Sequence, residues 1–203
     1  MKQLVQKQLA QSIATLQAVL ADDNIAETIV SIGEVTAKAM QNGKKLLVAG
    51  NGGSAADAQH LVAEFVVRLT VNRPALRAIA LTVDTSILTA VGNDFGYDTV
   101  FARQVEALGQ PGDVFLGIST SGNSKNILAA LKQANQQGIT TIGFTGSDGG
   151  EMRPLCEYNV VIPSTVTMNI QESHLALEHI FCMVVERFTF GMDFDKQPQI
   201  LSE

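Results

Sequence analysis

Apolar residues in the first 43 positions recur at the spacing of amphipathic helices. One stripe runs through residues 2–22, and a second begins after Asn24, a candidate helix cap, and stops at Gly43. The stripes contain Leu4, Val5, Leu9, Ile13, Leu16, Val19 and Leu20 in the first helix and Ile25, Ile29, Val30, Ile32 and Val35 in the second. Two helices that precede the first strand have little sheet to cover, so we expect them to pack between subunits of a homo-oligomer.

From Lys45 onward, short apolar runs alternate with helical stretches. The runs predict strands at 45–49, 78–81, 114–119, 140–145 and 159–162. Helices are predicted at 55–69, 86–92, 99–108, 125–137 and 168–188, with a short turn near Met152. This alternation predicts an α/β fold in three layers, with a five-stranded parallel sheet between helices. We expect a single domain over 1–203, made of the helical pair at 1–43, an α/β core at 44–190 and a polar tail at 191–203.

Composition restricts the partners that the chain can have. The formal net charge of -6 argues against a surface for nucleic acid or anionic membrane. Cys156 and Cys182 lack the CxxC spacing and suit the reduced thiols of a cytosolic protein. The first 23 residues are amphipathic and do not read as a signal peptide, and no stretch approaches the ~20 apolar residues that span a bilayer. We therefore expect a cytoplasmic protein.

Three of the predicted strands end in small or polar residues, where parallel sheets bind ligands. After the first strand, glycines allow a sharp turn, and Ser54 is a candidate cap for a helix that begins at Ala55. After the third strand, hydroxyls precede a helix N-terminus, a combination that suits a phosphate monoester, although a capped turn facing water is the alternative. The three segments are Gly50-Asn-Gly-Gly-Ser54, Ser119-Thr-Ser-Gly-Asn-Ser124 and Thr145-Gly-Ser-Asp-Gly-Gly150.

Two nucleotide-binding patterns are only partly matched. Gly117 and Gly122 have the spacing of the P-loop glycines, but Asn123 stands where that motif needs lysine. The Gly50-x-Gly52-x-x-Ala55 segment imitates a dinucleotide fingerprint, yet the acidic residue expected ~20 positions later is missing, and Asp84 lies much further along. Neither a nucleotide triphosphatase nor a nicotinamide enzyme is therefore expected.

Metal-binding and proton-transferring side chains gather on two predicted helices. His60 and Glu64 are four residues apart, on one face of the helix that follows the glycine turn. Such a pair can also be a solvated surface pair. The last helix carries Gln171, Glu172, His174, Glu178 and His179, and all three histidines of the chain fall on these two helices. This gathering of histidine, glutamate and glutamine side chains on two helices favours a metal site or a site of proton transfer.

Several motifs together resemble the phosphoheptose isomerases of the SIS sugar-isomerase family, over about residues 1–190. They are Gly50-Asn-Gly-Gly-Ser54, His60-x3-Glu64, Asn72-Arg-Pro74, Gly92-Asn-Asp-Phe-Gly96, Gly117-Ile-Ser-Thr-Ser-Gly-Asn-Ser124, Phe144-Thr-Gly146 and Ile170-Gln-Glu-x-His174 followed by His179. The resemblance implies a flavodoxin-like SIS fold and a homotetramer with one Zn²⁺ per subunit. It implies an aldose–ketose isomerase that converts sedoheptulose 7-phosphate to D-glycero-D-manno-heptose 7-phosphate, the first step toward the ADP-heptose of the lipopolysaccharide core.

The resemblance also implies roles for individual residues. Glu64 would be the base that takes a carbon-bound proton, and His179 the acid that protonates the carbonyl oxygen. The metal ligands would be His60, Glu64, Gln171 and His179. The substrate contacts would be Asn51, Gly52, Gly53, Glu64, Asn93, Asp94, Ser119, Thr120, Ser121, Ser124 and Gln171. Met168 stands where some isomerases have an aspartate, which puts a substrate contact from that position in question.

Two questions stay open at the level of sequence. A related module that binds the replication initiator lacks the carboxylate and the last histidine, which are present here as Glu64 and His179. The alternative function is therefore that of a non-catalytic module that binds a partner protein or senses a sugar phosphate. Gln171 and His179 are separated by a helical rise of ~12 Å and a rotation of ~80°. We therefore predict a metal site built across a subunit interface. His174 and Glu178, which repeat the HxxxE spacing, are candidates for an interface or supporting contact.

Overall fold

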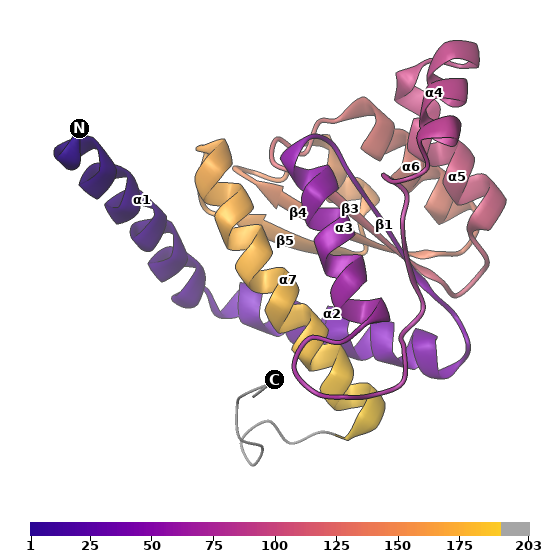
Figure 1. Ribbon diagram of the computed structural model, residues 1–203, viewed down its shortest axis with the longest axis horizontal. Coiled ribbons are helices and arrows are strands. Elements are labelled where there is room, and N and C mark those ends of the chain that lie inside the picture. The colour runs from indigo at the N-terminus through magenta and orange to yellow at the C-terminus, as the bar shows by residue number, and fades with distance from the viewer. Residues whose placement is uncertain (192–203) are drawn as a thin grey trace.

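The computed structural model describes residues 1–191. The chain begins with two helices, α1 (Lys2–Leu20) and α2 (Asp23–Gln41), and ends with the long α7 (Thr167–Phe190) (Figure 1). Between them come β1 (Leu46–Gly50), α3 (Gly53–Val66), β2 (Ala78–Ala80), α4 (Thr85–Asp94), η1 (Tyr97–Thr99), α5 (Val100–Leu108), β3 (Val114–Ser119), α6 (Lys125–Gln136), β4 (Thr140–Gly146), η2 (Gly150–Leu155) and β5 (Tyr158–Ile162). The predicted tail lies, beyond Gly191, outside the described residues.

The five strands form one parallel sheet in the order β2-β1-β3-β4-β5. The chain winds outward from β1 in both directions, so the loops after β1 and β3 meet where the strand order reverses. Such a switch point opens a crevice at the carboxyl ends of the strands. The predicted three-layer, five-stranded parallel sheet is confirmed, and the strand order is that of flavodoxin-like folds.

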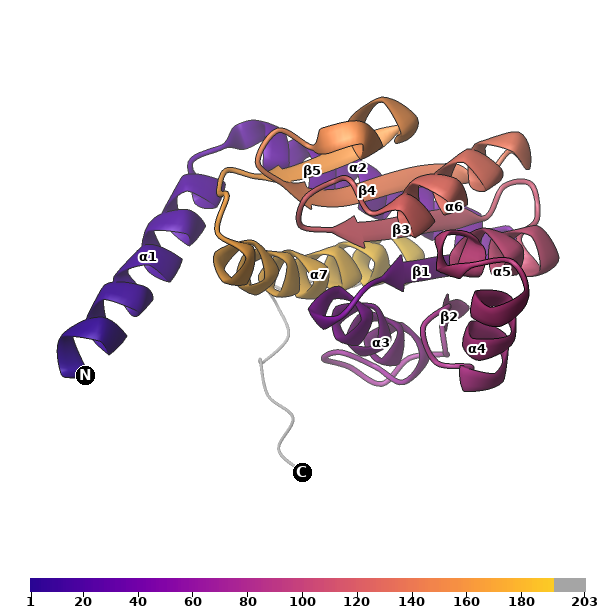
Figure 2. The same ribbon diagram turned by 90° about the horizontal axis from the view of Figure 1, so that it is seen from above.

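Side chains that alternate along each strand fill two separate cores. Leu46 and Val48 pack on one face of β1 with α2, α3 and α7, whereas Leu47 and Ala49 pack on the other face with α4, α5 and α6. The view from above shows these two helical layers on either side of the sheet (Figure 2). Because both faces are covered, β1 and β3 are buried along their whole length, which explains their continuous apolar sequences.

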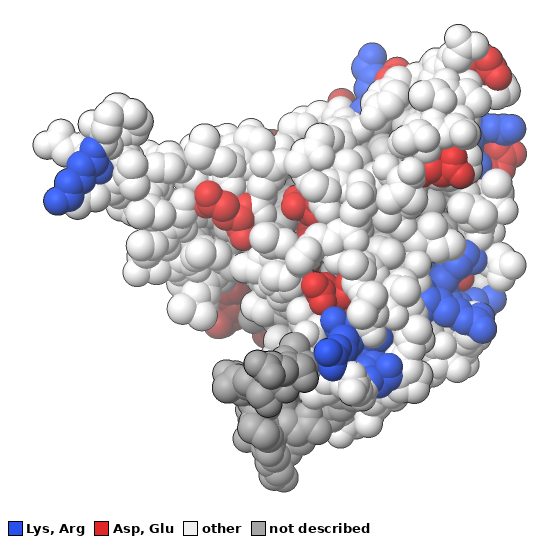
Figure 3. Space-filling view, viewed as in Figure 1, with Lys and Arg blue, Asp and Glu red and all other residues white. Residues whose placement is uncertain are grey.

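The first helix stands apart from the sheet and keeps its apolar stripe exposed (Figure 1). Val19 is buried, but the other six stripe residues are exposed, at Leu4, Val5, Leu9, Ile13, Leu16 and Leu20. In the space-filling view α1 carries few charged side chains along its length, and the basic ones lie near its N-terminal end (Figure 3). One hydrogen bond, from Gln8 Nε2 to Asn169 Oδ1 at 3.0 Å, ties α1 to the start of α7. The helix therefore presents an apolar face that no other part of the described chain covers.

Two helix starts differ from the sequence prediction. Asp22, and not Asn24, caps α2: its carboxylate accepts from the Asn24 backbone N–H at 3.0 Å. Ser54 does not cap α3, because the helix already begins at Gly53 after Gly52, whose φ of 58° favours glycine. Ser54 is instead buried in the first turn. Within residues 1–191, the helices lack the combination of length and apolarity that crossing a bilayer requires.

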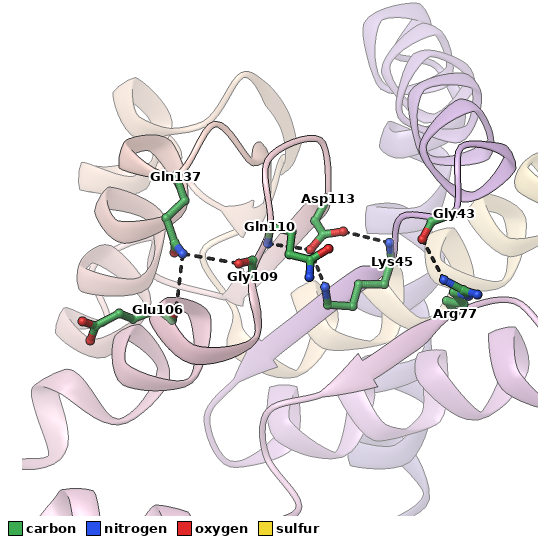
Figure 4. Close-up of polar contacts among 8 residues, drawn as sticks. All are labelled: Gly43, Lys45, Arg77, Glu106, Gly109, Gln110, Asp113 and Gln137. Atoms are coloured by element: carbon green, nitrogen blue, oxygen red, sulfur yellow. Dashed lines mark hydrogen bonds and ion pairs between the residues drawn. The ribbon is translucent and has the colours of Figure 1, made fainter.

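The amino ends of the strands are held by a buried carboxylate on the side opposite the switch point. Asp113 accepts from the Lys45 backbone N–H at 3.0 Å, from Lys45 Nζ at 2.6 Å and from the Gln110 backbone N–H at 2.8 Å (Figure 4). Arg77 donates to the Gly43 carbonyl nearby at 2.8 Å. Because Asp113 is fully buried and its partners belong to chain connections, we assign this network to the scaffold.

Candidate functional site

A polar pocket lies at the switch point, between the ends of β1 and β3 and the start of α7. It measures about 210 Å³ and is lined by Asn51, Ser54, Ile118, Ser119, Thr120, Ser121, Ser124, Thr167 and Gln171. Six of these were predicted as substrate contacts from the sequence: Asn51, Ser119, Thr120, Ser121, Ser124 and Gln171. Ser54 and Thr167 are polar lining residues that the sequence reading did not select. The hydroxyl-rich segments thus surround one small space.

The loop after β3 is shaped to present hydroxyls. Ser119 Oγ and Ser124 Oγ lie 2.9 Å apart, so the loop closes on itself across the strand end. The Ser124 side chain does not cap α6, although Ser124 is the residue that precedes the helix. Gly122 has a φ of 66°, and a Cβ there would collide with the Gly149 carbonyl. The hydroxyls of this loop line the pocket directly before the N-terminus of α6, a position at which proteins commonly bind anions.

A reciprocal pair of amides joins the glycine turn to this loop. Asn51 Nδ2 donates to Asn126 Oδ1 at 2.9 Å, and Asn126 Nδ2 donates back to Asn51 Oδ1 at 2.8 Å. Tyr97 Oη adds a longer hydrogen bond to Asn51 Oδ1 at 3.3 Å. Asn126 is buried, and the sequence offered no sign of its role beyond its place in the first turn after Ser124. The pair fixes the orientation of Asn51 in the pocket.

Three of the predicted metal ligands meet on facing sides of α3 and α7. His60 Nε2 and His179 Nε2 lie 2.7 Å apart, and His60 Nε2 lies 3.5 Å from Glu64 Oε1. The ligand atoms of the three residues all fall within 4.8 Å of one another. Two nitrogens bound to a tetrahedral zinc at 2.0–2.1 Å would be separated by ~3.3 Å. The donor set fits Zn²⁺ after the two rings move apart by less than an ångström.

Gln171 does not join this group of three within the chain. Its side-chain amide lies against Gly53, where an added Cβ would collide with Nε2. The helices α3 and α7 run side by side in the same direction, so Gln171 is beside the start of α3 while His179 is beside its middle (Figures 1 and 2). A single chain therefore assembles three of the four predicted ligands. The sequence prediction did not foresee that His60, Glu64 and His179 would come from one chain.

Other predicted contacts lie further out. Asn93 and Asp94 are exposed at the end of α4, where Asn93 Nδ2 donates to Asp94 Oδ1 at 2.7 Å. They are not among the residues that line the pocket. Gly52 and Gly53 supply the backbone turn between Asn51 and Ser54, two residues that do line it. Met168 is exposed at the start of α7, next to the lining residue Thr167.

Two titratable groups of α7 are buried beneath the site. His174 Nε2 donates to the Thr145 carbonyl, 3.0 Å away, and burial lowers the pKa of His174 to about 4. Burial and, to a lesser extent, the nearby Asp57 carboxylate together raise the pKa of Glu178 to about 8. Both side chains are fully buried within one chain, so the suggested subunit contact is wrong. Asp57 lies one turn before His60, so Glu178 is close to the part of α3 that carries this candidate ligand.

The chain is similar to known proteins over most of its length. A model of the SIS domain matches residues 8–146. The chain is 50% identical over 196 residues to the phosphoheptose isomerase of Clostridium acetobutylicum, with 97% of this chain and 100% of that protein covered. It is 54% identical over 185 residues to phosphoheptose isomerase 2 of Campylobacter jejuni, with 91% and 92% covered.

A solved structure shows the same fold. The phosphoheptose isomerase of Neisseria gonorrhoeae superposes with a TM-score of 0.86 at 41% identity, covering 91% of this chain and 98% of that one. The chain belongs to the SIS-domain family and, within it, to the phosphoheptose isomerases.

Proposed function

We propose that this isomerase converts sedoheptulose 7-phosphate to D-glycero-D-manno-heptose 7-phosphate. The observation that carries the proposal is the convergence of His60, Glu64 and His179 on the same two helices that border the hydroxyl-rich pocket. Along α3 the seven helical steps from Gly53 to His60 give a rise of ~10 Å. That distance is comparable to an extended seven-carbon sugar phosphate. The names of the relatives, phosphoheptose isomerase, support the same substrate class.

In this proposal the pocket binds the substrate, and the side chains on α3 and α7 carry out the proton transfers. The phosphate binds at the hydroxyls of the loop after β3, far from the carbons that react, and its binding orients the other end of the sugar. Glu64 takes the proton from the carbon that loses it, and His179 delivers a proton to the carbonyl oxygen. An enediol lies between ketose and aldose. Each such group typically contributes ~10²–10⁴-fold to the rate.

We further propose that the enzyme depends on a divalent metal, and that the metal is Zn²⁺, one per subunit. His60, Glu64 and His179 would hold it, and when bound it would polarise the substrate oxygen. Glu64 has two carboxylate oxygens, so one can bind the metal while the other accepts a proton. His179 presents Nε2 to the cluster, so at any moment that nitrogen either binds metal or carries the proton for transfer. His179 would therefore serve as a metal ligand or as the acid, but not as both at the same time.

The oligomer completes the proposal. We propose a homotetramer in which residues 1–43 form the contacts between subunits, residues 44–190 form the catalytic core of a single domain and 191–203 are a tail. The exposed stripe of α1 and an apolar groove between α1, α2 and α7 support this arrangement. Because Gln171 cannot reach His179 of its own helix, we propose that Gln171 of a neighbouring subunit supplies the fourth ligand.

We place the reaction in the cytoplasm, as the step that begins supply of ADP-heptose for the lipopolysaccharide core. Cys156 and Cys182 are both free thiols, which supports a reducing compartment. The product of a seven-carbon phosphate isomerase is an aldose, the form that can later be activated at its anomeric carbon. No contact with nucleic acid or membrane is needed for this role.

The test is an assay of the purified full-length protein with sedoheptulose 7-phosphate, before and after chelation and after Zn²⁺ is restored. We expect turnover that a chelator abolishes and Zn²⁺ recovers. Turnover that persists without metal would contradict metal dependence, while binding without turnover would indicate the non-catalytic alternative. A second arm with fructose 6-phosphate tests the length of the sugar, because a six-carbon substrate reaches less far from the pocket.

A further inference from the structure

A buried arginine joins the two helices that carry the proposed base and acid. Arg73 lies in the connection between α3 and β2, and its side chain is only 1% exposed. Its Nε donates to Glu186 Oε1 on α7 at 2.7 Å, and the Glu186 side chain is fully buried. A buried charge of this kind is costly unless it is paired, so the contact is a specific one.

The same guanidinium also holds the end of α3. One terminal nitrogen of Arg73 donates to the Glu64 carbonyl at 2.7 Å, and the other donates to the Phe65 carbonyl at 2.7 Å. These carbonyls belong to the last turn of α3, which ends at Val66 and leaves them without partners inside the helix. Arg73 therefore satisfies the helix terminus at the residue that is the proposed base.

Apart from the contact between His60 and His179 themselves, the remaining contacts between α3 and α7 are less directional. The Phe65 and Phe181 rings pack in a tilted arrangement with their centroids 5.6 Å apart, and neighbouring contacts are apolar. Apolar packing favours burial but tolerates a small shift of one helix along the axis of the other. A planar guanidinium that makes several directed hydrogen bonds does not tolerate such a shift. Glu186 lies two turns after His179 on α7. A single side chain thus sets the axial register of α3 against α7 close to the site.

We propose that Arg73 is a positioning residue that fixes Glu64 and His179 at the spacing required for metal binding and proton transfer. The inference rests on the proposed function for its catalytic consequence. Its structural part concerns only the relation of α3 to α7. Lysine cannot replace arginine here, because a single ammonium cannot span Glu186 and two carbonyls in fixed directions.

The decisive variant is Arg73→Lys, which keeps the charge beside Glu186 and removes the fork. We expect kcat to fall by ~10- to 100-fold with little change in KM, because an error of about 1 Å in position can cost that much and the phosphate pocket is remote. Zn²⁺ affinity, measured by competition with a chelator, should fall by ~10- to 100-fold. Glu186→Gln, which leaves the bonds to the α3 carbonyls, should shift both quantities in the same direction by less.

Lys45→Met is the matched control, because it removes another buried ion-paired contact, with Asp113, on the far side of the sheet. It should lower thermal stability without changing kcat or Zn²⁺ affinity of the folded protein. The proposal would be overturned if Arg73→Lys kept the wild-type kcat and Zn²⁺ affinity. It would also be overturned if Lys45→Met, compared at the same folded fraction, lost as much of both as Arg73→Lys.

The structural part has its own measurement. A crystal structure of Arg73→Lys, or of Glu186→Gln if the first variant does not fold, should show a changed separation of His60 Nε2 and His179 Nε2. An unchanged separation would overturn the inference even if the enzyme were slower. If the wild type binds Zn²⁺ but does not turn over sedoheptulose 7-phosphate, the proposed function fails, and the affinities and the crystal structure still decide the role of Arg73.

Discussion

His60 and His179 are 119 residues apart in the chain, yet their Nε2 atoms lie 2.7 Å from each other. Two imidazole nitrogens approach this closely only when a proton or a cation lies between them, because two lone pairs repel. Glu64 adds a carboxylate oxygen 3.5 Å from His60 Nε2. In the proposed mechanism, metal binding and proton transfer would both take place at these atoms.

Removal of one ligand should remove the metal. His60→Gln keeps a polar side chain but loses the imidazole nitrogen, so we expect Zn²⁺ affinity to fall by ~10²-fold or more and turnover to fall with it. Metal content after dialysis and activity with added Zn²⁺ are the measurements. Wild-type metal content in this variant would contradict the proposed ligand set.

Replacement of the base should stop chemistry without unfolding the protein. Glu64→Gln is nearly isosteric, and we expect turnover to fall by at least ~10²-fold, since an amide cannot accept the carbon-bound proton. Circular dichroism and the melting temperature should stay close to those of the wild type. Because Glu64 is also a proposed ligand, the assay is run with saturating Zn²⁺. Activity within a few-fold of the wild type would rule Glu64 out as the base.

The hydroxyl pair of the phosphate pocket should affect binding more than chemistry. Ser124→Ala removes the partner of Ser119 and one phosphate donor, so we expect KM to rise about tenfold while kcat changes little. Ser31→Ala on α2, whose hydroxyl donates to the Glu27 carbonyl, is the control and should leave both constants unchanged. A fall in kcat at constant KM would show that Ser124 acts on the reacting end instead.

The buried His174 should make stability depend on pH. Its pKa is lowered to about 4, so the unfolded chain binds a proton at higher pH than the folded chain does. Its contribution to stability is complete above pH ~6.5 and is lost as the pH falls toward 4. When unfolding in urea is measured at pH 7 and at pH 4, the free energy of unfolding of the wild type should fall by about 3 kcal/mol more than that of His174→Gln.

The comparison of the two proteins isolates this effect. The raised pKa of Glu178, about 8, acts in the opposite sense, so that its contribution falls as the pH rises from ~4.5 to 8. That term is shared by the wild type and His174→Gln and cancels in their difference. Parallel stability curves for the two proteins would show that His174 does not titrate as burial suggests.

Charges placed on the apolar stripe of α1 should break the proposed oligomer. Leu9 and Ile13 are 59% and 55% exposed in the single chain. In a Leu9→Lys, Ile13→Lys double variant, light scattering should give a smaller mass than the wild type, with lower activity. Gln11→Lys, on the opposite side of the same helix, should keep the wild-type mass. A wild-type mass for the double variant would contradict the role of α1.

The sequence predicted best what depends on local pattern. Buried parallel strands are continuous apolar runs, so Val114–Ser119 was predicted with its observed bounds. The start of α3 was missed, because Gly52 adopts a positive φ and the helix begins before Ser54. The histidines were found because they are few and spaced along helices, and the hydroxyl loop because it follows a strand.

Residues that act through distant partners left no local sign. Asn126 meets Asn51 across 75 positions, and Arg73 meets Glu186 across 113. An asparagine in a helical turn and an arginine in a connection are ordinary surface residues by composition. Their burial follows from how the sheet and α7 fold around them. The same reason kept the meeting of His60, Glu64 and His179 within one chain from being foreseen.

The paired amides of Asn51 and Asn126 have a consequence for how the protein ages. Asn51 precedes Gly52, and asparagine before glycine is the sequence most prone to spontaneous deamidation, because the small residue lets the backbone attack the side chain. An aspartate at this position would turn a donor into a second acceptor opposite Asn126 Oδ1 and add a negative charge beside the proposed phosphate site. Preparations stored for a long time would then lose substrate affinity first, while their melting temperature stayed close to that of fresh protein.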